Sequence, residues 1–284
     1  MTEQTSHILT LECSDQPGIV ARIATGIADL GGNILSNAQF SEPSLGRFCM
    51  RTRFSAQIDE PEEIAEILRG NAEAFEAVLE VRRADHRTRT LVMVGKFDHC
   101  LRDLLYRWHA GELPVDIPLV VSNHWDLQPV AANYGVPFVH IPVTSDTKPQ
   151  AEQKLLDLIE EHDIELTVLA RYMQILSDDL CKQLEGRAIN IHHSFLPGFK
   201  GARPYHQAWT RGVKLIGATA HYVTGDLDEG PIIDQGVARV THAHTADDLA
   251  ILGRDVERMV LSAAVKAHTE QRVFRFGDRT VVFQ

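Results

Sequence analysis

An amide, an imidazole and three carboxylates lie close together in the last third of the chain. Asn190 and His192 are two residues apart in the run AINIHH, and Asp226, Asp228 and Glu229 follow in a glycine-flanked loop after the run ATAHYV. Side chains two apart on an extended backbone point to the same face. An amide, an imidazole and a carboxylate brought together can polarise a carbonyl, stabilise an oxyanion and manage a proton. The set favours acyl-group chemistry without a cofactor of its own.

The same residue types also have a simpler interpretation. Asn and His often satisfy backbone groups in turns, and an acidic glycine-flanked loop is typical of a protein surface. The position of Asn190 and His192 at the end of a predicted strand favours function, because ligands bind beyond the carboxyl ends of parallel strands. We expect His193 to face the opposite side as a supporting residue. Spacing alone leaves the choice among the three carboxylates open.

The first 85 residues predict a small ferredoxin-like domain of the order βαββαβ. Apolar spacing of period two or of helical period predicts strands at 7–13, 34–42, 47–56 and 77–84 and helices at 19–30 and 61–75. Gly31 and Gly32 end the first helix, and Pro61 opens the second. The polar run 84–90 is the predicted linker.

Residues 86–284 predict a second, α/β domain. Strands alternate with helices, with strands expected at 90–95, 117–123, 138–143, 166–170 and 188–193 and helices at 99–108, 127–133, 149–161 and 178–184. This alternation predicts a Rossmann-like, mostly parallel sheet with helices on both faces. The run 246–269 has apolar residues three and four apart, which is typical of a helix packed on the core.

Composition excludes several classes of protein. The formal net charge of −11 argues against nucleic acid as a partner, since phosphate neutralisation needs a basic surface. The four cysteines form no CxxC pair, so neither a zinc ribbon nor a disulfide framework is expected. No basic leader or bilayer-length apolar run is evident, and a cytoplasmic protein with no membrane partner is the simplest expectation. His242 and His244 have the alternate spacing of a metal pair, but no third ligand is near, and surface histidines are favoured over a metal site.

Residues 190–233 resemble the folate-dependent formyltransferase family, whose signature is an Asn-x-His pair, a Leu-Pro turn and a later Asp in an LD-x-G loop. The resemblance covers most of residues 88–284 and implies catalytic roles for Asn190, His192 and Asp228, with Asp226 and Glu229 left as surface residues. The run ARYMQILS resembles the family's loop at the pterin pocket. The substrate-binding residues that the resemblance implies are Arg171, Met173, Gln174, Leu176, His221 and Thr224, of which His221 would support Asp228.

The chain lacks a phosphate-binding loop, and this absence bears on whether an amine or water is the nucleophile. The glycinamide ribonucleotide transformylases of this family hold the phosphate of their acceptor in a GxGSN loop after the first strand. The corresponding run 94–105 has a single glycine, with Phe97 and Asp98 where an anion cradle needs small residues. The run HHSFLPGFKGARPYHQA is more similar to the deformylases of the family than to its transferases, and no role is assigned to Lys200 within it. The implied reaction is hydrolysis of 10-formyltetrahydrofolate, the folate substrate, to formate and tetrahydrofolate.

The N-terminal run 15–34, DQPGIVARIATGIADLGGNI, resembles an ACT domain, the amino-acid-sensing module that fronts the deformylases. This resemblance implies an amino-acid effector near Asp15, Gly18 and Asn33, although a plain turn and a helix stop explain the same residues. ACT domains commonly pair edge to edge, so a homo-oligomer is expected. Two alternatives remain: a formyltransferase with an amine acceptor, and a regulatory binding protein without turnover.

Overall fold

The structure, a computed structural model of the chain, describes residues 5–194 and 204–284. The chain divides into two compact units, of which one comprises Met1–His86, Glu270–Phe276 and Val281–Gln284 and the other comprises Arg87–Thr269 and Gly277–Thr280. The predicted fold class is confirmed: a ferredoxin-like unit precedes an α/β unit with a mostly parallel sheet. The C-terminal residues, which the sequence analysis assigned to the second domain, are grouped largely with the first unit.

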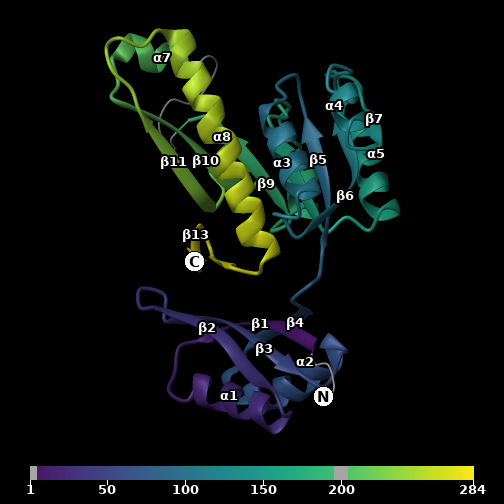
Figure 1. The fold of residues 1–284 in the computed structure, drawn as a ribbon, viewed down its shortest axis with the longest axis vertical. Helices are drawn as coiled ribbons and strands as arrows, with labels where there is room; N and C mark the ends of the chain where they lie inside the picture. Colours follow the sequence, from purple (N-terminus) through teal and green to yellow (C-terminus); the bar gives the residue numbers. More distant parts are fainter. Residues whose placement is uncertain (1–4, 195–203) are drawn as a thin grey trace. The chain divides into compact units, whose positions relative to one another are not determined.

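The first unit has the predicted order βαββαβ (Figure 1). Its elements are β1 (Thr5–Ser14), α1 (Ile19–Asp29), β2 (Asn33–Glu42), β3 (Arg47–Ala56), α2 (Pro61–Ala72), the short 3-10 helix η1 (Glu73–Phe75) and β4 (Val78–Arg83). The strands form an antiparallel sheet in the order β2-β3-β1-β4. Alternate residues of β1 (Leu9, Leu11 and Cys13) pack against apolar residues of α1 and α2. Strand β2 lies at the edge of the sheet and is exposed along most of its length.

The first unit includes most of a C-terminal hairpin, all but its residues Gly277–Thr280. Strands β12 (Val273–Phe276) and β13 (Arg279–Val282) pair around Gly277, whose φ of 63° suits a tight turn. Phe274 and Phe276 form a small buried cluster with Cys49 of β3. The Nε of Arg51 donates to the carbonyl of Glu270 at 2.9 Å. These contacts explain why the end of the chain belongs to the ferredoxin-like unit.

The second unit is built on a seven-stranded sheet in the order β11-β10-β9-β8-β5-β6-β7. Its strands are β5 (Thr88–Val94), β6 (Val115–Ser122), β7 (Phe138–His140), β8 (Leu166–Ala170), β9 (Ala188–His192), β10 (Leu215–Tyr222) and β11 (Ile232–Arg239). The strands from β9 to β7 run parallel, whereas β10 is antiparallel to both of its neighbours. The carboxyl ends of β5, β8 and β9 therefore meet at one edge of the sheet.

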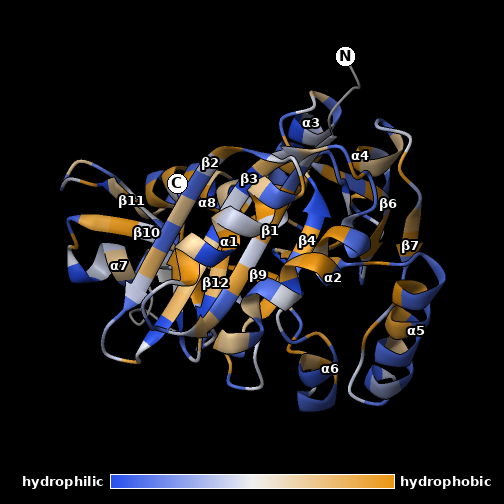
Figure 2. Cartoon of the chain, turned by 90° about the horizontal axis from the view of Figure 1, so that it is seen from below, coloured by the Kyte–Doolittle hydropathy of each residue, from blue (hydrophilic) through white to orange (hydrophobic). Residues whose placement is uncertain are grey.

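Helices cover both faces of this sheet. They are α3 (His99–His109), α4 (Gln128–Ala132), α5 (Lys148–Glu161), α6 (Asp178–Gln183), α7 (Pro204–Arg211) and α8 (Ala246–Thr269). Figure 2 shows α5 with bands of polar residues between hydrophobic ones, and its buried residues are spaced four apart (Ala151, Leu155 and Ile159). The long helix α8 packs on β9, β10 and β11 and against α3 and α7.

Two boundaries differ from those predicted. Strand β5 begins at Thr88, so the irregular segment between the two sheets is confined to residues 84–87. Thr88 and Thr90 are buried in the strand, and the Thr90 hydroxyl donates to the Thr88 carbonyl at 2.9 Å, whereas the Thr88 hydroxyl has no hydrogen-bond partner among the described residues. Strand β7 is only three residues long. Within residues 5–194 and 204–284, no helix is long and apolar enough to cross a membrane.

Candidate active site

Strands β9 and β10 bring Asn190 and His221 side by side. The two residues are direct partners in the antiparallel pairing, and the Nδ2 of Asn190 lies 3.2 Å from the Nε2 of His221. The Nδ1 of His221 lies 2.8 Å from the carbonyl oxygen of Tyr222, which can only accept, so Nδ1 carries the proton. Burial lowers the pKa of His221. The neutral ring then accepts at Nε2 from the Asn190 amide, and this fixes which way the amide faces.

The loop after β10 presents one carboxylate to the strand ends. The Oδ1 of Asp228 lies 3.1 Å from the Nδ1 of His192 and 3.8 Å from the Nε2 of His221. Asp228 has a left-handed backbone with φ 58°. Gly230 makes the turn possible, since a Cβ there would lie 1.8 Å from the carbonyl oxygen of Tyr222. Of the three carboxylates that the sequence left open, Asp228 is the one beside His192.

The other two acidic residues of this loop, Asp226 and Glu229, are exposed. The carbonyl of Asp226 accepts from the Thr224 hydroxyl at 3.1 Å, so Thr224 shapes the turn. A Cβ at Gly225 would meet only Asp178 at ordinary contact distance. The loop therefore turns one acidic side chain inward and leaves its neighbours in solvent.

Electrostatics keep the Asp228 carboxylate ionised. Burial by itself raises the pKa of this carboxyl, but the hydrogen bond from His192 and the electrostatic attraction of the same ring outweigh it, and the pKa lies below its ordinary value. His192 donates through Nδ1, and its Nε2 is buried with no hydrogen-bond partner among the described residues. That Nε2 is the ring atom left for a ligand. Asn190, His192 and Asp228 can together hold an oxyanion and accept a proton.

Comparisons with known proteins show the family of this chain. A family model described as formyl transferase matches residues 88–265, and one described as ACT domain matches residues 7–70. A formyltetrahydrofolate deformylase from Corynebacterium sp. (strain P-1) is 48% identical over 288 residues, which cover 100% of both chains. The chain belongs to the formyltetrahydrofolate deformylase family.

Two kinds of solved structure match this chain: deformylases and glycinamide ribonucleotide transformylases. A formyltetrahydrofolate deformylase from Burkholderia mallei matches with a TM-score of 0.94 and 49% identity, covering 99% of this chain and 100% of that one. A glycinamide ribonucleotide transformylase from Symbiobacterium toebii matches with a TM-score of 0.65 and 27% identity, covering 70% of this chain and 95% of that one. The deformylase thus matches almost the whole chain, whereas the transformylase leaves nearly a third of it unmatched.

In this member of the deformylase family, two of the predicted substrate residues line one pocket. Gln174 and Leu176 face a mainly apolar pocket beside α5. Its other lining residues are Met93, Val121, Ile141, Val143, Lys148, Ala151, Glu152, Leu155, Tyr172, Ile175 and Leu180. Lys148 and Glu152 were not anticipated from the sequence, because polar residues on an amphipathic helix ordinarily indicate its solvent face. Glu152 also holds the segment in place, since its Oε1 accepts from the backbone N–H of Ser177 at 2.8 Å.

The other predicted substrate residues lie elsewhere. Met173 is 56% exposed and does not line the pocket. Arg171 has φ 64°, and its guanidinium lies 5.1 Å from the ring of Phe97. His221 lies beside Asp228, as predicted for a supporting residue. The structure therefore brings together Asn190, His192, His221 and Asp228 but separates Arg171 and Met173 from the pocket.

A buried charge cluster was missed from the sequence. Glu257 of α8 is 1% exposed and accepts from His99 at 2.7 Å and from Tyr205 at 2.5 Å. Arg171 Nε lies 3.4 Å from the same carboxylate. The sequence could have pointed to Glu257, because it lies between Gly253 and Val260 on the buried face of α8, where a charged residue is unusual.

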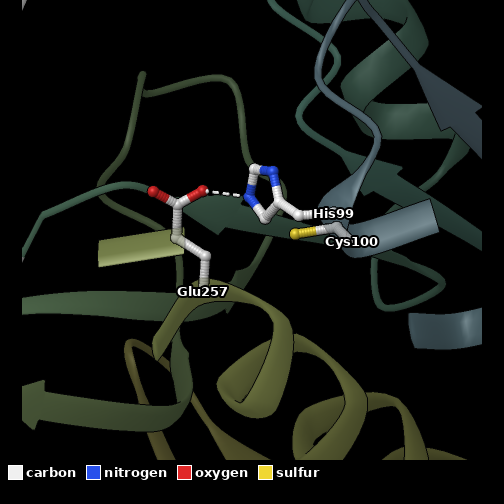
Figure 3. A group of neighbouring side chains, drawn as sticks. All are labelled: His99, Cys100 and Glu257. Carbon is white, nitrogen blue, oxygen red and sulfur yellow. Dashed lines mark hydrogen bonds and ion pairs between the residues drawn. The ribbon is translucent and has the colours of Figure 1, made fainter. Parts of the chain in front are cut away.

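The cluster also contains the residues that come closest to a metal-binding set. Figure 3 shows the His99 ring and the Glu257 carboxylate pointing toward each other, with Cys100 alongside, and their candidate ligand atoms lie within 4.8 Å of one another. Burial raises the pKa of the Cys100 thiol well above its ordinary value, whereas a metal binds the thiolate. The Glu257 oxygens already accept from His99 and Tyr205. These residues fit a charge cluster better than a metal centre.

The predicted effector residues lie at opposite ends of the sheet of the first unit, because Ser14, next to Asp15, pairs with Arg47 of β3, whereas Asn33 pairs with Ser55. Gly18 has φ 95° at the start of α1, and Asn33 begins the exposed strand β2. Asp15 is exposed, and its carboxylate accepts from the Ser41 hydroxyl. His242 is exposed in a turn rather than on a strand, which suits a surface histidine. The Leu-Pro turn at 196–197 and Lys200 lie outside the described residues.

Proposed function

We propose that the chain hydrolyses 10-formyltetrahydrofolate to formate and tetrahydrofolate. The observation that carries the proposal is the contact of Asp228 with His192, 3.1 Å apart, at the carboxyl end of the strand that also carries Asn190. The full-length relatives that match this chain are named for the same reaction. The backbone around Gln174 and Leu176, which border the narrow apolar pocket beside α5, is the proposed contact of the pterin ring.

The proposed roles follow from the hydrogen bonds. One N–H of the Asn190 amide goes to His221, which leaves the other to donate to the formyl oxygen. The Nε2 of His192, once protonated, is a second donor to that oxygen, and Asp228 stabilises the imidazolium through Nδ1. The second carboxylate oxygen of Asp228 orients a water molecule and accepts its proton as the water attacks the formyl carbon. Collapse of the tetrahedral intermediate breaks the C–N bond, and the nitrogen takes up the proton that Asp228 accepted from the water. The formic acid that leaves releases its own proton to solvent and becomes formate.

Water is the proposed nucleophile because the segment after β5 does not suit a phosphorylated acceptor. Asp98 precedes the first residue of α3, where a phosphate would otherwise bind. The hydrogen bond from Arg102, at 2.5 Å, holds the pKa of the Asp98 carboxyl below its ordinary value, so it is ionised at neutral pH. A carboxylate at that position repels phosphate. Phe97, 42% exposed, occupies the same segment.

The test is formate release from purified protein and 10-formyltetrahydrofolate without an amine. We expect steady release that amines do not accelerate. A rate at background until an amine is added would favour a formyltransferase, and binding without turnover would favour a regulatory protein. We propose that no cofactor or metal is needed, so dialysis against a chelator should leave the rate unchanged. A loss that one divalent cation restores would contradict this part.

We propose further that the first unit is an ACT domain that binds an amino acid. We also propose that the β2 edges of two copies of the chain pair in a cytoplasmic homo-oligomer, and that neither nucleic acid nor a membrane is a partner. Supporting the pairing, the edge strand β2 exposes Ile34, Leu35 and Phe40 by 39%, 52% and 41%. Leu35→Lys should lower the molar mass measured by light scattering. Titration with amino acids should release heat in the wild type and not in Asp15→Ala. An unchanged mass, or heat retained by Asp15→Ala, would contradict the respective proposal.

A further inference from the structure

The antiparallel pairing of β9 with β10 ends at His192. Its last pair is His192 of β9 opposite Thr219 of β10. His192 is also the last residue of β9, and the chain bends at His193 and Ser194. The strand pairing therefore supports the backbone up to His192, whereas the direction of the chain after it depends on other contacts.

The hydroxyl of Thr219 makes one of those contacts. Thr219 is fully buried, and its Oγ1 donates to the carbonyl oxygen of Ser194 at 3.1 Å. Ser194 is 5% exposed, so little water is available to replace this hydrogen bond. The bond joins the bend to the residue that faces His192 across the strand pair. It therefore fixes the backbone two residues beyond the imidazole.

Gln235 of β11 sets the direction of the Thr219 hydroxyl. Gln235 and Thr219 are direct partners in the pairing of β10 with β11, and Gln235 Nε2 lies 3.0 Å from Thr219 Oγ1. A hydroxyl has one proton, and that of Thr219 goes to the Ser194 carbonyl. The hydroxyl oxygen therefore accepts from the Gln235 amide. An acceptor at position 235 would instead draw the proton away from Ser194.

These side chains form one row across three strands. Directly paired residues of antiparallel strands share a face of the sheet, so His192, Thr219 and Gln235 lie on the same face. Asn190 and His221 form the pair two residues away and share that face as well. The row of Thr219 and Gln235 therefore adjoins the proposed catalytic groups without being one of them.

We propose that Thr219 and Gln235 are positioning residues that hold His192 in contact with Asp228. The inference rests on the proposed function, in which these two groups act on the formyl oxygen and the water. The contact is 3.1 Å long, so a small shift of the backbone at His192 would break it. A misplacement of about 1 Å can lower a rate by about a hundredfold. Neither positioning residue lines the pocket beside α5, so the effect should fall on kcat and not on KM.

The test is formate release from 10-formyltetrahydrofolate by the purified full-length protein. Thr219→Val keeps the shape of the side chain and loses the hydroxyl, so kcat should fall by about tenfold to a hundredfold with KM nearly unchanged. Thr219→Ser keeps the hydroxyl and should restore most of the rate.

Gln235→Glu keeps the shape and replaces the amide donor by a carboxylate that is ionised at neutral pH. It should therefore lower kcat about as much as Thr219→Val does. The double variant should lose no more than Thr219→Val alone, because both changes break the same hydrogen bond.

Thr90→Val is the matched control. Thr90 is buried in the same sheet, and its hydroxyl also donates to a carbonyl, that of Thr88. Its kcat should stay within about twofold of the wild type, because Thr90 lies away from the carboxyl ends of the strands. If circular dichroism shows that Thr219→Val does not fold, Gln235→Glu decides, since Gln235 is only half-buried.

Three results would overturn the positioning role. They are wild-type kcat in folded Thr219→Val or Gln235→Glu, no recovery in Thr219→Ser, and an equal loss in Thr90→Val. Any of these, with formate released by the wild type, refutes the positioning role and leaves the proposed function standing. Absence of release from the wild type refutes the proposed function and this inference with it.

Discussion

Substitution of Asp228 by Asn is the sharpest test of the site. Asn tolerates the left-handed backbone that Asp228 adopts at φ 58°, so the loop should keep its shape. The variant loses the charge that His192 Nδ1 contacts at 3.1 Å and loses the proposed base for water. Loss of a positioned general base typically lowers a rate by about 10²–10⁴-fold. We expect a kcat loss in that range with little change in KM, because Asp228 does not line the pocket beside α5.

The same loop supplies the control. Asp226 lies two residues before Asp228, and its side chain is exposed, so Asp226→Asn removes the same charge from the protein surface. The kcat of this variant should stay within about twofold of wild type, since substitutions of exposed residues usually have little effect. Formate release under saturating substrate is the assay, and thermal unfolding confirms that both variants fold. A folded Asp228→Asn protein with more than a tenth of the wild-type kcat would refute the reasoning. So would an equal loss in Asp226→Asn.

Three further outcomes are expected. Asn190→Ala and His192→Ala should each lower kcat on the order of a hundredfold with the fold retained, the usual effect of losing one oxyanion donor; near-normal turnover in either variant would contradict the assigned roles. Gly230→Ala should lower kcat by about a hundredfold and reduce the melting temperature, because its Cβ would lie 1.8 Å from the Tyr222 carbonyl oxygen and must displace the Asp228 loop; unchanged kinetics would show that the loop adapts. Glu257 has a lowered pKa, so the stability it contributes is present above the unfolded carboxyl value of about 4.3 and is lost as pH falls through the folded value. Glu257→Gln should therefore cost about 3–5 kcal/mol of unfolding free energy near pH 7 and less at low pH, as denaturant titrations would measure, and a pH-independent difference would argue against an ionised Glu257.

Much of the site followed from local spacing. Asn190 and His192 lie on β9, as their alternation predicted, and the sheet order places that strand end beside the loop of Asp228. The selection of Asp228 came from the family signature, since spacing did not separate the three carboxylates. Its left-handed backbone turns it inward. A single sequence does not reveal such a dihedral angle at a non-glycine residue.

The cluster around Glu257 shows where local patterns stop being informative. Its members come from α3, the segment after β8, α7 and α8, which are far apart in the chain. No periodicity links them, because only the tertiary packing brings them together. Arg171 was predicted at the substrate through its neighbours in the ARYMQILS run, yet its side chain lies against Glu257 and Phe97. Adjacent residues of one loop thus place their side chains in different surroundings.

The C-terminal hairpin changes what one cut in the chain would do. Residues 84–87 are the irregular segment between the sheets, and a protease that cleaves there leaves a C-terminal fragment with Phe274 and Phe276 still attached. Those rings pack with Cys49 in the first unit, and Arg51 bonds to Glu270. The nicked halves would therefore stay associated through packing that belongs to a single folded unit. A protein truncated after residue 85 would lack these partners and expose Cys49. The ferredoxin-like unit therefore needs the C-terminal residues of the chain to complete its packing.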